Sequence, residues 1–255
     1  MMTIISLLLL ASLLPHLTFT ASVNVGIVNG TEAKPHSRPY MVSVQIDKQH
    51  ACGGFLISER FVMTAAHCQI ISPALTVVLG AHELHKKGEN LVRIKVESSH
   101  QHSDYKPETL RNDLMLLKLE RNVHLNDNIK PISIPTEEGD IEAGSVCSVA
   151  GWGLLETNGT ISDRLMEKNV MVMDNRKCES KWTKTVFSAS LMMCVYGDGG
   201  SCVGDSGGPL VCGDTAFGVS SFGDRKLCNS PELPEVYTKI STYLPWIKKI
   251  IGNGN

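Results

Sequence analysis

The sequence predicts an all-β protein, a sandwich or barrel, that ends in one short helix. Short apolar runs recur along the chain and are separated by Gly, Pro, Asn and Asp. Several of them alternate apolar and polar residues, as residues 91–96 do, which is typical of a strand with one face in a core. The C-terminus differs, because four apolar residues recur there at helical spacing: Trp246, Ile247, Ile250 and Ile251. This spacing predicts an amphipathic helix over about residues 242–252.

The strands are expected where these runs lie. Examples are residues 41–46, 76–79, 91–96, 114–119, 146–150, 170–173, 216–220 and 236–240. A stretch with two prolines at residues 130–135 is the predicted seam between two halves of the fold. Periodicity alone leaves a sandwich and a pair of barrels as alternatives.

The first residues are predicted to direct secretion and to lie outside the fold. Residues 4–14 are almost wholly apolar, and a run of that length is too short to span a bilayer but typical of a signal peptide. Small residues follow, which suit signal peptidase. We therefore expect a signal peptide over residues 1–22 and a short propeptide over residues 23–26, with an uncleaved anchor as the alternative.

Composition narrows the class of protein. The net charge of −2 and the absence of a lysine-arginine run argue against nucleic-acid binding. Eight cysteines behind a signal peptide indicate four disulfides in an oxidising compartment, although their number alone does not pair them. No two cysteines have the Cys-x-x-Cys spacing typical of zinc sites. We expect no metal, no cofactor and, once the signal peptide is removed, no membrane association.

Three short motifs carry candidate catalytic residues. Gly204-Asp205-Ser206-Gly207-Gly208-Pro209 surrounds Ser206 with glycines, which permit a sharp turn and the approach of a substrate carbonyl. A serine hydroxyl needs a base to take its proton, and Thr64-Ala65-Ala66-His67-Cys68 places His67 beside a cysteine that can fix it. Asn112-Asp113-Leu114 places Asp113 at the head of an apolar strand, where a buried acid needs a partner such as an imidazole. Each motif taken alone is also compatible with an ordinary turn. Five other histidines have no such setting and are assigned to the surface: His82, His85, His100, His102 and His124.

In the order His, Asp, Ser, these motifs resemble the chymotrypsin/trypsin family of serine proteases, and within it the granzymes, mast-cell proteases and cathepsin G. The resemblance runs from Ile27 onward. It also rests on Ile27-Val28-Asn29-Gly30, Cys52-Gly53-Gly54, Ala150-Gly151-Trp152-Gly153, Ser221-Phe222-Gly223 and Val236-Tyr237-Thr238-Lys239. It implies a peptidase domain over residues 27–255 with two antiparallel six-stranded β-barrels, about 27–132 and 133–240, and an active site between them.

The resemblance also implies roles for individual residues. Ser206 is the nucleophile, His67 its base and Asp113 the acid that orients His67 and accepts a hydrogen bond from Ser221. The backbone amides of Gly204 and Ser206 form the oxyanion hole. After cleavage, the new ammonium group of Ile27 pairs with Asp205. The implied disulfides are Cys52–Cys68, Cys147–Cys212, Cys178–Cys194 and Cys202–Cys228.

The propeptide points to an unusual activator. Gly26 precedes Ile27, where a trypsin-like activator would need Arg or Lys. Signal cleavage after Ser22 leaves four residues, which are two dipeptides, and cleavage after Thr20 leaves three dipeptides. We therefore expect a dipeptidyl peptidase to trim the precursor, as the resemblance to granule proteases implies.

The specificity pocket departs from that of trypsin. Gly200 stands where trypsin-like members carry an Asp, and Glu235 stands where most members carry a small residue. A carboxylate at 235 narrows the pocket and makes it negative, as in cathepsin G, which implies cleavage after Lys or Arg and also after Phe, Tyr or Leu. Other residues predicted at this pocket are Ser201, Ser221, Phe222 and Gly223. The alternative is that Glu235 points into solvent from a lengthened loop.

The sequence thus predicts a secreted serine endopeptidase, stored in secretory granules, that hydrolyses peptide bonds through an acyl-enzyme. Its expected partners are protein or peptide substrates, serpin-type inhibitors and the activating dipeptidyl peptidase, and the expected state is a monomer. Asn158 is the glycosylation candidate, whereas the sequon at Asn29 lies beside the activation terminus and is expected to be unused. The alternatives are a digestive-type protease, which the short non-tryptic propeptide argues against, and a catalytically silent binding protein, which would lack part of the triad.

Overall fold

The structure is a computed structural model that describes residues 27–69, 75–86, 91–182, 186–224 and 226–253. The predicted signal peptide and propeptide lie outside these residues. Within them, no helix combines the length and the apolar character that a membrane crossing requires.

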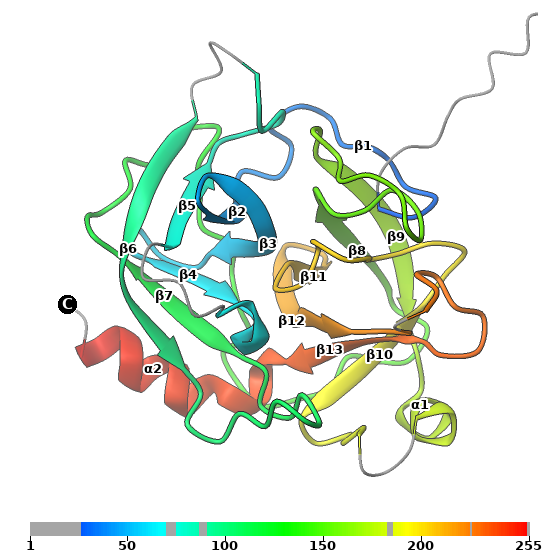
Figure 1. Cartoon of the computed structure of the whole chain (residues 1–255). Coiled ribbons are helices and arrows are strands. Elements are labelled where there is room, and N and C mark those ends of the chain that lie inside the picture. Colours follow the sequence, from blue (N-terminus) through cyan, green and yellow to red (C-terminus); the bar gives the residue numbers. More distant parts are fainter. Residues whose placement is uncertain (1–26, 70–74, 87–90, 183–185, 225, 254–255) are drawn as a thin grey trace, which may run out of the picture.

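The first half of the chain forms a closed antiparallel barrel (Figure 1). Its strands are β2 (Met41–Ile46), β3 (Gln49–Leu56), β4 (Phe61–Thr64), β5 (Leu75–Leu79), β6 (Val92–Gln101) and β7 (Met115–Leu119). They pair in the order β2-β3-β4-β7-β6-β5, and β5 returns to β2. The barrel interior is filled by apolar side chains without exposed surface, among them Val44, Phe55 and Leu116.

The second half forms another barrel. Its strands are β8 (Val146–Gly151), β9 (Met166–Val172), β10 (Met192–Tyr196), β11 (Pro209–Cys212), β12 (Thr215–Phe222) and β13 (Glu235–Lys239). They pair in the order β9-β10-β13-β12-β11-β8, and β8 closes the ring on β9. The short β1 (Thr31–Glu32) adds to the outer side of β9. The two closed rings confirm the predicted fold class.

Helices occur at the edges of the barrels. The 3₁₀ turn η1 (Ala66–Cys68) follows β4 and carries His67. Helix α1 (Asn175–Lys181) begins after Asp174, whose carboxylate accepts hydrogen bonds from two amides of the first turn. The 3₁₀ turn η2 (Ile240–Tyr243) leads into α2 (Leu244–Asn253). Ile247 of α2 packs in the core of the first barrel (Figure 1). Because α2 follows β13 of the second barrel in the chain, the C-terminal helix links the two barrels.

The predicted strands all occur, and β2 has the predicted bounds. The predicted ranges do not include strands β1, β3, β4, β10 and β11 or helix α1. In β3 the run Ala51-Cys52-Gly53-Gly54 interrupts the alternation on which the prediction depends. The surface assignment of His82 is wrong, since it is only 4% exposed, and its Nε2 lies 2.9 Å from Glu32 Oε1.

Candidate active site

The predicted catalytic residues meet where the two barrels touch. The amide of Gly53 on β3 donates to the carbonyl of Ser206, at 2.9 Å, and the amide of Gly207 donates to Ser220 on β12, at 2.8 Å. The Ser206 turn is therefore bonded to both barrels. A side chain at Gly207 would come within 2.1 Å of Thr64 Oγ1, so this close approach requires a glycine.

His67 and Asp113 are joined by two hydrogen bonds. The Nδ1 of His67 lies 2.7 Å from Asp113 Oδ2, and the amide of His67 donates to Asp113 Oδ1 at 2.9 Å. Ser221 donates to Oδ2 at 2.5 Å. The carboxylate has no exposed surface, and these three donors compensate for its burial. Because Nδ1–H faces the acid, Nε2 is left with a free lone pair.

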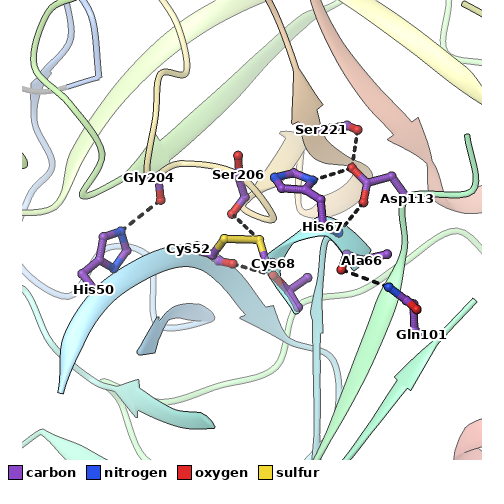
Figure 2. Close-up of a disulfide and its surroundings, with 12 residues drawn as sticks. His50, Cys52, Ala66, His67, Cys68, Gln101, Asp113, Gly204, Ser206 and Ser221 are labelled. Carbon is purple, nitrogen blue, oxygen red and sulfur yellow. Dashed lines mark hydrogen bonds and ion pairs between the residues drawn. A yellow bond between two sulfur atoms is a disulfide. The ribbon is translucent and has the colours of Figure 1, made fainter. Parts of the chain in front are cut away.

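Ser206 lies on the open side of this imidazole (Figure 2). The Sγ of Cys68, next to His67, is 3.7 Å from the Ser206 carbonyl oxygen. Within the described residues, the Ser206 hydroxyl makes no hydrogen bond to His67. Such looser contacts are common in active sites without a substrate.

Two backbone amides beside Ser206 are free of internal partners. In the described part of the chain, neither the amide of Gly204 nor that of Ser206 donates to a protein acceptor, whereas those of Asp205, Gly207 and Gly208 all do. Gly204 has a φ of +98°, which favours glycine. Buried amides are nearly always paired, so this unpaired couple suits a ligand oxygen.

His50 supports this turn, and the sequence analysis missed it. Its Nε2 lies 3.0 Å from the carbonyl oxygen of Gly204 (Figure 2). Its Nδ1 lies 2.8 Å from Ser43 Oγ. Burial lowers the pKa of His50 to about 4, so the ring is neutral at physiological pH. A neutral ring that donates through Nε2 to Gly204 must accept through Nδ1 from Ser43. No local motif marks His50, because its partner lies more than 150 residues away.

Asp205 points away from the triad into the second barrel. It accepts hydrogen bonds from the amides of Gly153, at 2.8 Å, and Cys202, at 2.9 Å. Side chains at Gly151 or Gly153 would overlap its carboxylate, which explains the two glycines of the Gly-Trp-Gly motif. Burial raises the pKa of Asp205 to about 7, although the two amides oppose this shift.

The segment that begins at Ile27 is seated in the same barrel. Ile27 has no exposed surface and packs in the core cluster that contains Val149, Met193 and Tyr237. The carbonyl of Val28 accepts a hydrogen bond from the amide of Gly200 at 3.1 Å. Ile27 therefore belongs to the core of the second barrel.

The structure contains the four disulfides that the resemblance implied. Cys52–Cys68 joins β3 to the turn of His67, and Cys202–Cys228 joins the turn before Ser206 to the loop after β12. Among the described residues, one group of side chains could gather round a metal ion, namely Cys52, His67 and Cys68. Its two sulfurs are bonded to each other, so these residues offer no thiolate and do not fit a metal.

A cavity of about 190 Å³ opens beside Ser206. Its lining includes the predicted pocket residues Ser201, Ser221, Phe222, Gly223 and Glu235. Gly200 does not line it, because the carboxylate of Glu235 covers this glycine. A side chain at position 200 would come within 2.2 Å of Glu235 Oε1. Glu235 therefore faces the cavity, and the alternative orientation into solvent is not observed.

The Glu235 carboxylate is held by hydroxyl groups. Tyr237 donates to Glu235 Oε2 at 3.1 Å, and the Tyr237 hydroxyl lies 2.6 Å from Ser201 Oγ. Burial raises the pKa of Glu235 to about 8, against the opposing effect of hydrogen bonds from Ser201 and Tyr237. The acid that lines the cavity is thus mostly protonated at neutral pH and ionises as the pH rises through about 8.

The two sequons lie at Asn158 and Asn29. Asn158 occupies a turn with a φ of +60°. Asn29 is exposed, and its Nδ2 donates to the carbonyl of Asp198 at 2.5 Å.

Comparisons with known proteins identify the family. The family described as Trypsin matches residues 27–247. Granzyme-like protein 2 of Rattus norvegicus is 44% identical over 230 residues, which cover 88% of this chain and 89% of the relative. Cathepsin G of Homo sapiens is 39% identical over 95% of this chain and 92% of the relative. The solved structure of neuropsin, a serine protease expressed in the limbic system of mouse brain, superposes with a TM-score of 0.82 at 34% identity and covers 88% of this chain and 100% of its own. The chain belongs to the trypsin family of serine proteases and is a serine endopeptidase.

Proposed function

We propose that this enzyme is a secreted endopeptidase that cleaves peptide bonds through an acyl-enzyme, with Ser206 as nucleophile, His67 as general base and Asp113 as the orienting acid. One observation carries the proposal. A serine, an imidazole oriented by a fully buried carboxylate and two unpaired backbone amides lie together at the mouth of a cavity.

The mechanism follows from these positions. The Nε2 of His67 removes the proton of Ser206 as Oγ attacks the substrate carbonyl, and Asp113 stabilises the imidazolium that forms. The amides of Gly204 and Ser206 donate to the carbonyl oxygen as it becomes negative. The imidazolium then protonates the leaving amine, and a water molecule activated by the same base hydrolyses the ester.

Activation is proposed to depend on the terminal ammonium of Ile27. Asp205 is buried and, among the described residues, has amide donors but no ion-pair partner. An ammonium group released at Ile27 would supply the missing charge and lower the pKa of Asp205. Removal of dipeptides up to Gly26 by a dipeptidyl peptidase would create this terminus.

The proposed substrates carry Lys or Arg, or Phe, Tyr or Leu, on the acyl side of the cleaved bond. Glu235 supports both classes. When it is ionised, its carboxylate can bind the cation of a Lys or Arg side chain. When it is neutral, it forms an uncharged end of the cavity against which a flat apolar side chain can pack. Secretion, storage in granules, inhibition by serpin-type proteins, a monomeric state and a glycan at Asn158 are parts of the same proposal. They rest on the sequence motifs and on relatives such as cathepsin G.

The test compares wild-type enzyme with Ser206→Ala, both prepared with Ile27 as the first residue. We expect the wild type to react with an organophosphorus probe at Ser206 and to cleave a peptide library. The alanine variant loses about six orders of magnitude in kcat, as in other triads. Matching near-ultraviolet circular dichroism would show that both chains are folded. Cleavage by the variant at the wild-type rate, or a folded wild type that does not react, would refute the proposal.

A further inference from the structure

Glu235 differs from the other buried acids of the site in what surrounds it. Asp113 faces His67, and Asp205 accepts hydrogen bonds from the amides of Gly153 and Cys202. The Glu235 carboxylate contacts the hydroxyl of Tyr237, which is in turn bonded to Ser201. Among the described residues, no cation lies within ion-pair distance of it. Its charge is therefore not fixed by a permanent partner.

The charged and titratable groups around Glu235 come from four directions. On its own strand and on the turn before Ser206 lie Tyr237, whose pKa is raised well above its ordinary value by burial, and Asp205, whose charge opposes ionisation of Glu235. Asp224 stands on the far side of the cavity that contains Ser206. Behind Glu235 lie Tyr196 and three charged side chains: Lys177, Lys181 and Glu232.

The lysines behind Glu235 are already engaged. Lys181 pairs with Glu232 at 3.5 Å, and Lys177 lies over the ring of Tyr196, 5.7 Å from its centroid. Neither forms an ion pair with Glu235. A cation that enters the front cavity is thus the natural partner of the ionised acid.

Glu235 also has a second opening. Besides the cavity at Ser206, it lines a separate cavity of about 250 Å³ between α1, β10 and residues 229–235. Water in this rear cavity can exchange a proton with the carboxyl group even when a substrate side chain fills the front cavity. The protonation state can therefore follow the pH of the medium in free and substrate-bound enzyme.

We propose that a single proton on Glu235 selects between the two substrate classes: the ionised carboxylate accepts Lys or Arg, and the protonated acid accepts aromatic side chains. This inference rests on the proposed function of the same cavity. Chemically, an ammonium or guanidinium group supplies the missing counter-charge, whereas an aromatic ring would bury the carboxylate against apolar surface, which is costly when it is charged. The raised pKa, about 8, places the change close to neutral pH.

The experiment measures kcat/KM for two peptide substrates that differ only in Lys or Phe before the cleaved bond, from about pH 6 to about pH 9. Ionisations shared by both reactions cancel in the ratio of the two constants. We expect the Lys/Phe ratio to rise about tenfold per pH unit over the whole range, because cleavage after Lys follows the ionised fraction of Glu235 and cleavage after Phe follows the protonated fraction.

Glu235→Gln keeps the shape and cannot ionise. We expect its ratio to be low and independent of pH, with cleavage after Phe retained. Tyr237→Phe removes a hydrogen bond that lowers the pKa of Glu235, so we expect a lower Lys/Phe ratio than in the wild type at each pH. Asp224→Asn is the matched control, because Asp224 lines the same cavity but its pKa is lowered, first by the amide of Lys226. It is ionised over the whole range, and its removal leaves the pH dependence of the ratio in place.

A second readout does not depend on turnover. An acid with a raised pKa in the folded state ionises earlier in the unfolded chain, so its contribution to stability is lost as pH rises from about 4.5 through about 8. The Tm of the wild type therefore falls relative to that of Glu235→Gln over this window. A flat ratio in a wild type that cleaves both substrates, together with parallel Tm curves, overturns the inference and leaves the proposed function intact. A folded enzyme that cleaves neither substrate refutes the substrate classes of the proposed function instead.

Discussion

The two halves of the active site reach their working state by different routes. In the first barrel, Asp113 receives bonds from the amide and ring of His67 and from Ser221. In the second barrel, Asp205 is equally buried but, within the described residues, receives only the amides of Gly153 and Cys202. Folding alone thus supplies Asp113 with its partners, whereas Asp205 has no counter-charge among the described residues, which the proposed activation would provide.

This difference suggests that activation acts on Asp205 and the amides beside it. An ionised carboxylate without a counter-charge is costly to bury. Burial accordingly raises the pKa of Asp205, which remains inside the second barrel. The free amides of Gly204 and Ser206 flank Asp205 in the chain. Asp205, the acid without a counter-charge, is therefore covalently next to the amides proposed to stabilise the oxyanion. The base, His67, is held by Asp113 and does not depend on Asp205.

The largest effect is expected in the half that is complete. Asp113→Asn replaces an acceptor by an amide that can donate to Nδ1, which favours the tautomer with the proton on Nε2, where no base remains. We expect kcat to fall about 10⁴-fold, the size found for this change in another triad. Single-turnover kinetics of the activated variant would measure it. A loss smaller than tenfold would contradict the role of Asp113.

A smaller effect is expected in the half that needs activation. Asp205→Asn removes the partner of the Ile27 ammonium, and we expect a loss of about 10²- to 10³-fold in kcat, the cost of an impaired oxyanion hole. The exposed Asp127 offers a matched control, because its substitution by Asn should leave kcat unchanged.

The comparison can be sharpened with a double-variant cycle. Wild-type enzyme that retains Gly26 lacks the same ion pair as Asp205→Asn, so the combined variant should be no worse than either one alone. If instead the two losses multiply, Ile27 and Asp205 act independently and the proposed activation is wrong.

The smallest effect concerns His50. His50→Phe keeps a ring beside Trp152 but removes the bond to the Gly204 carbonyl. One hydrogen bond of this kind contributes about 0.5–1.5 kcal/mol, which corresponds to about a three- to tenfold loss. We expect the loss in kcat with little change in KM, and recovery in His50→Gln, whose amide can still donate. Equal kcat values in both variants would exclude a positioning role.

The sequence alone determined the strands that alternate strictly and the motifs around His67, Asp113 and Ser206. These features are local, because strand faces and tight turns depend on residues a few positions apart. Strand β3 was not predicted, because Cys52, which is bonded to Cys68, and Gly53, which approaches Gly208 of the second barrel, interrupt its alternation.

Only the tertiary structure decided which distant groups meet. It placed His50 on Gly204, buried His82 against Glu32, left the Gly204 and Ser206 amides unpaired and laid Glu235 over Gly200. Each of these depends on the closure of a barrel or on the docking of one barrel against the other. A pattern of neighbouring residues carries no information on such contacts, because the hydrogen bonds, burial and pKa shifts exist only once the chain has brought the groups together.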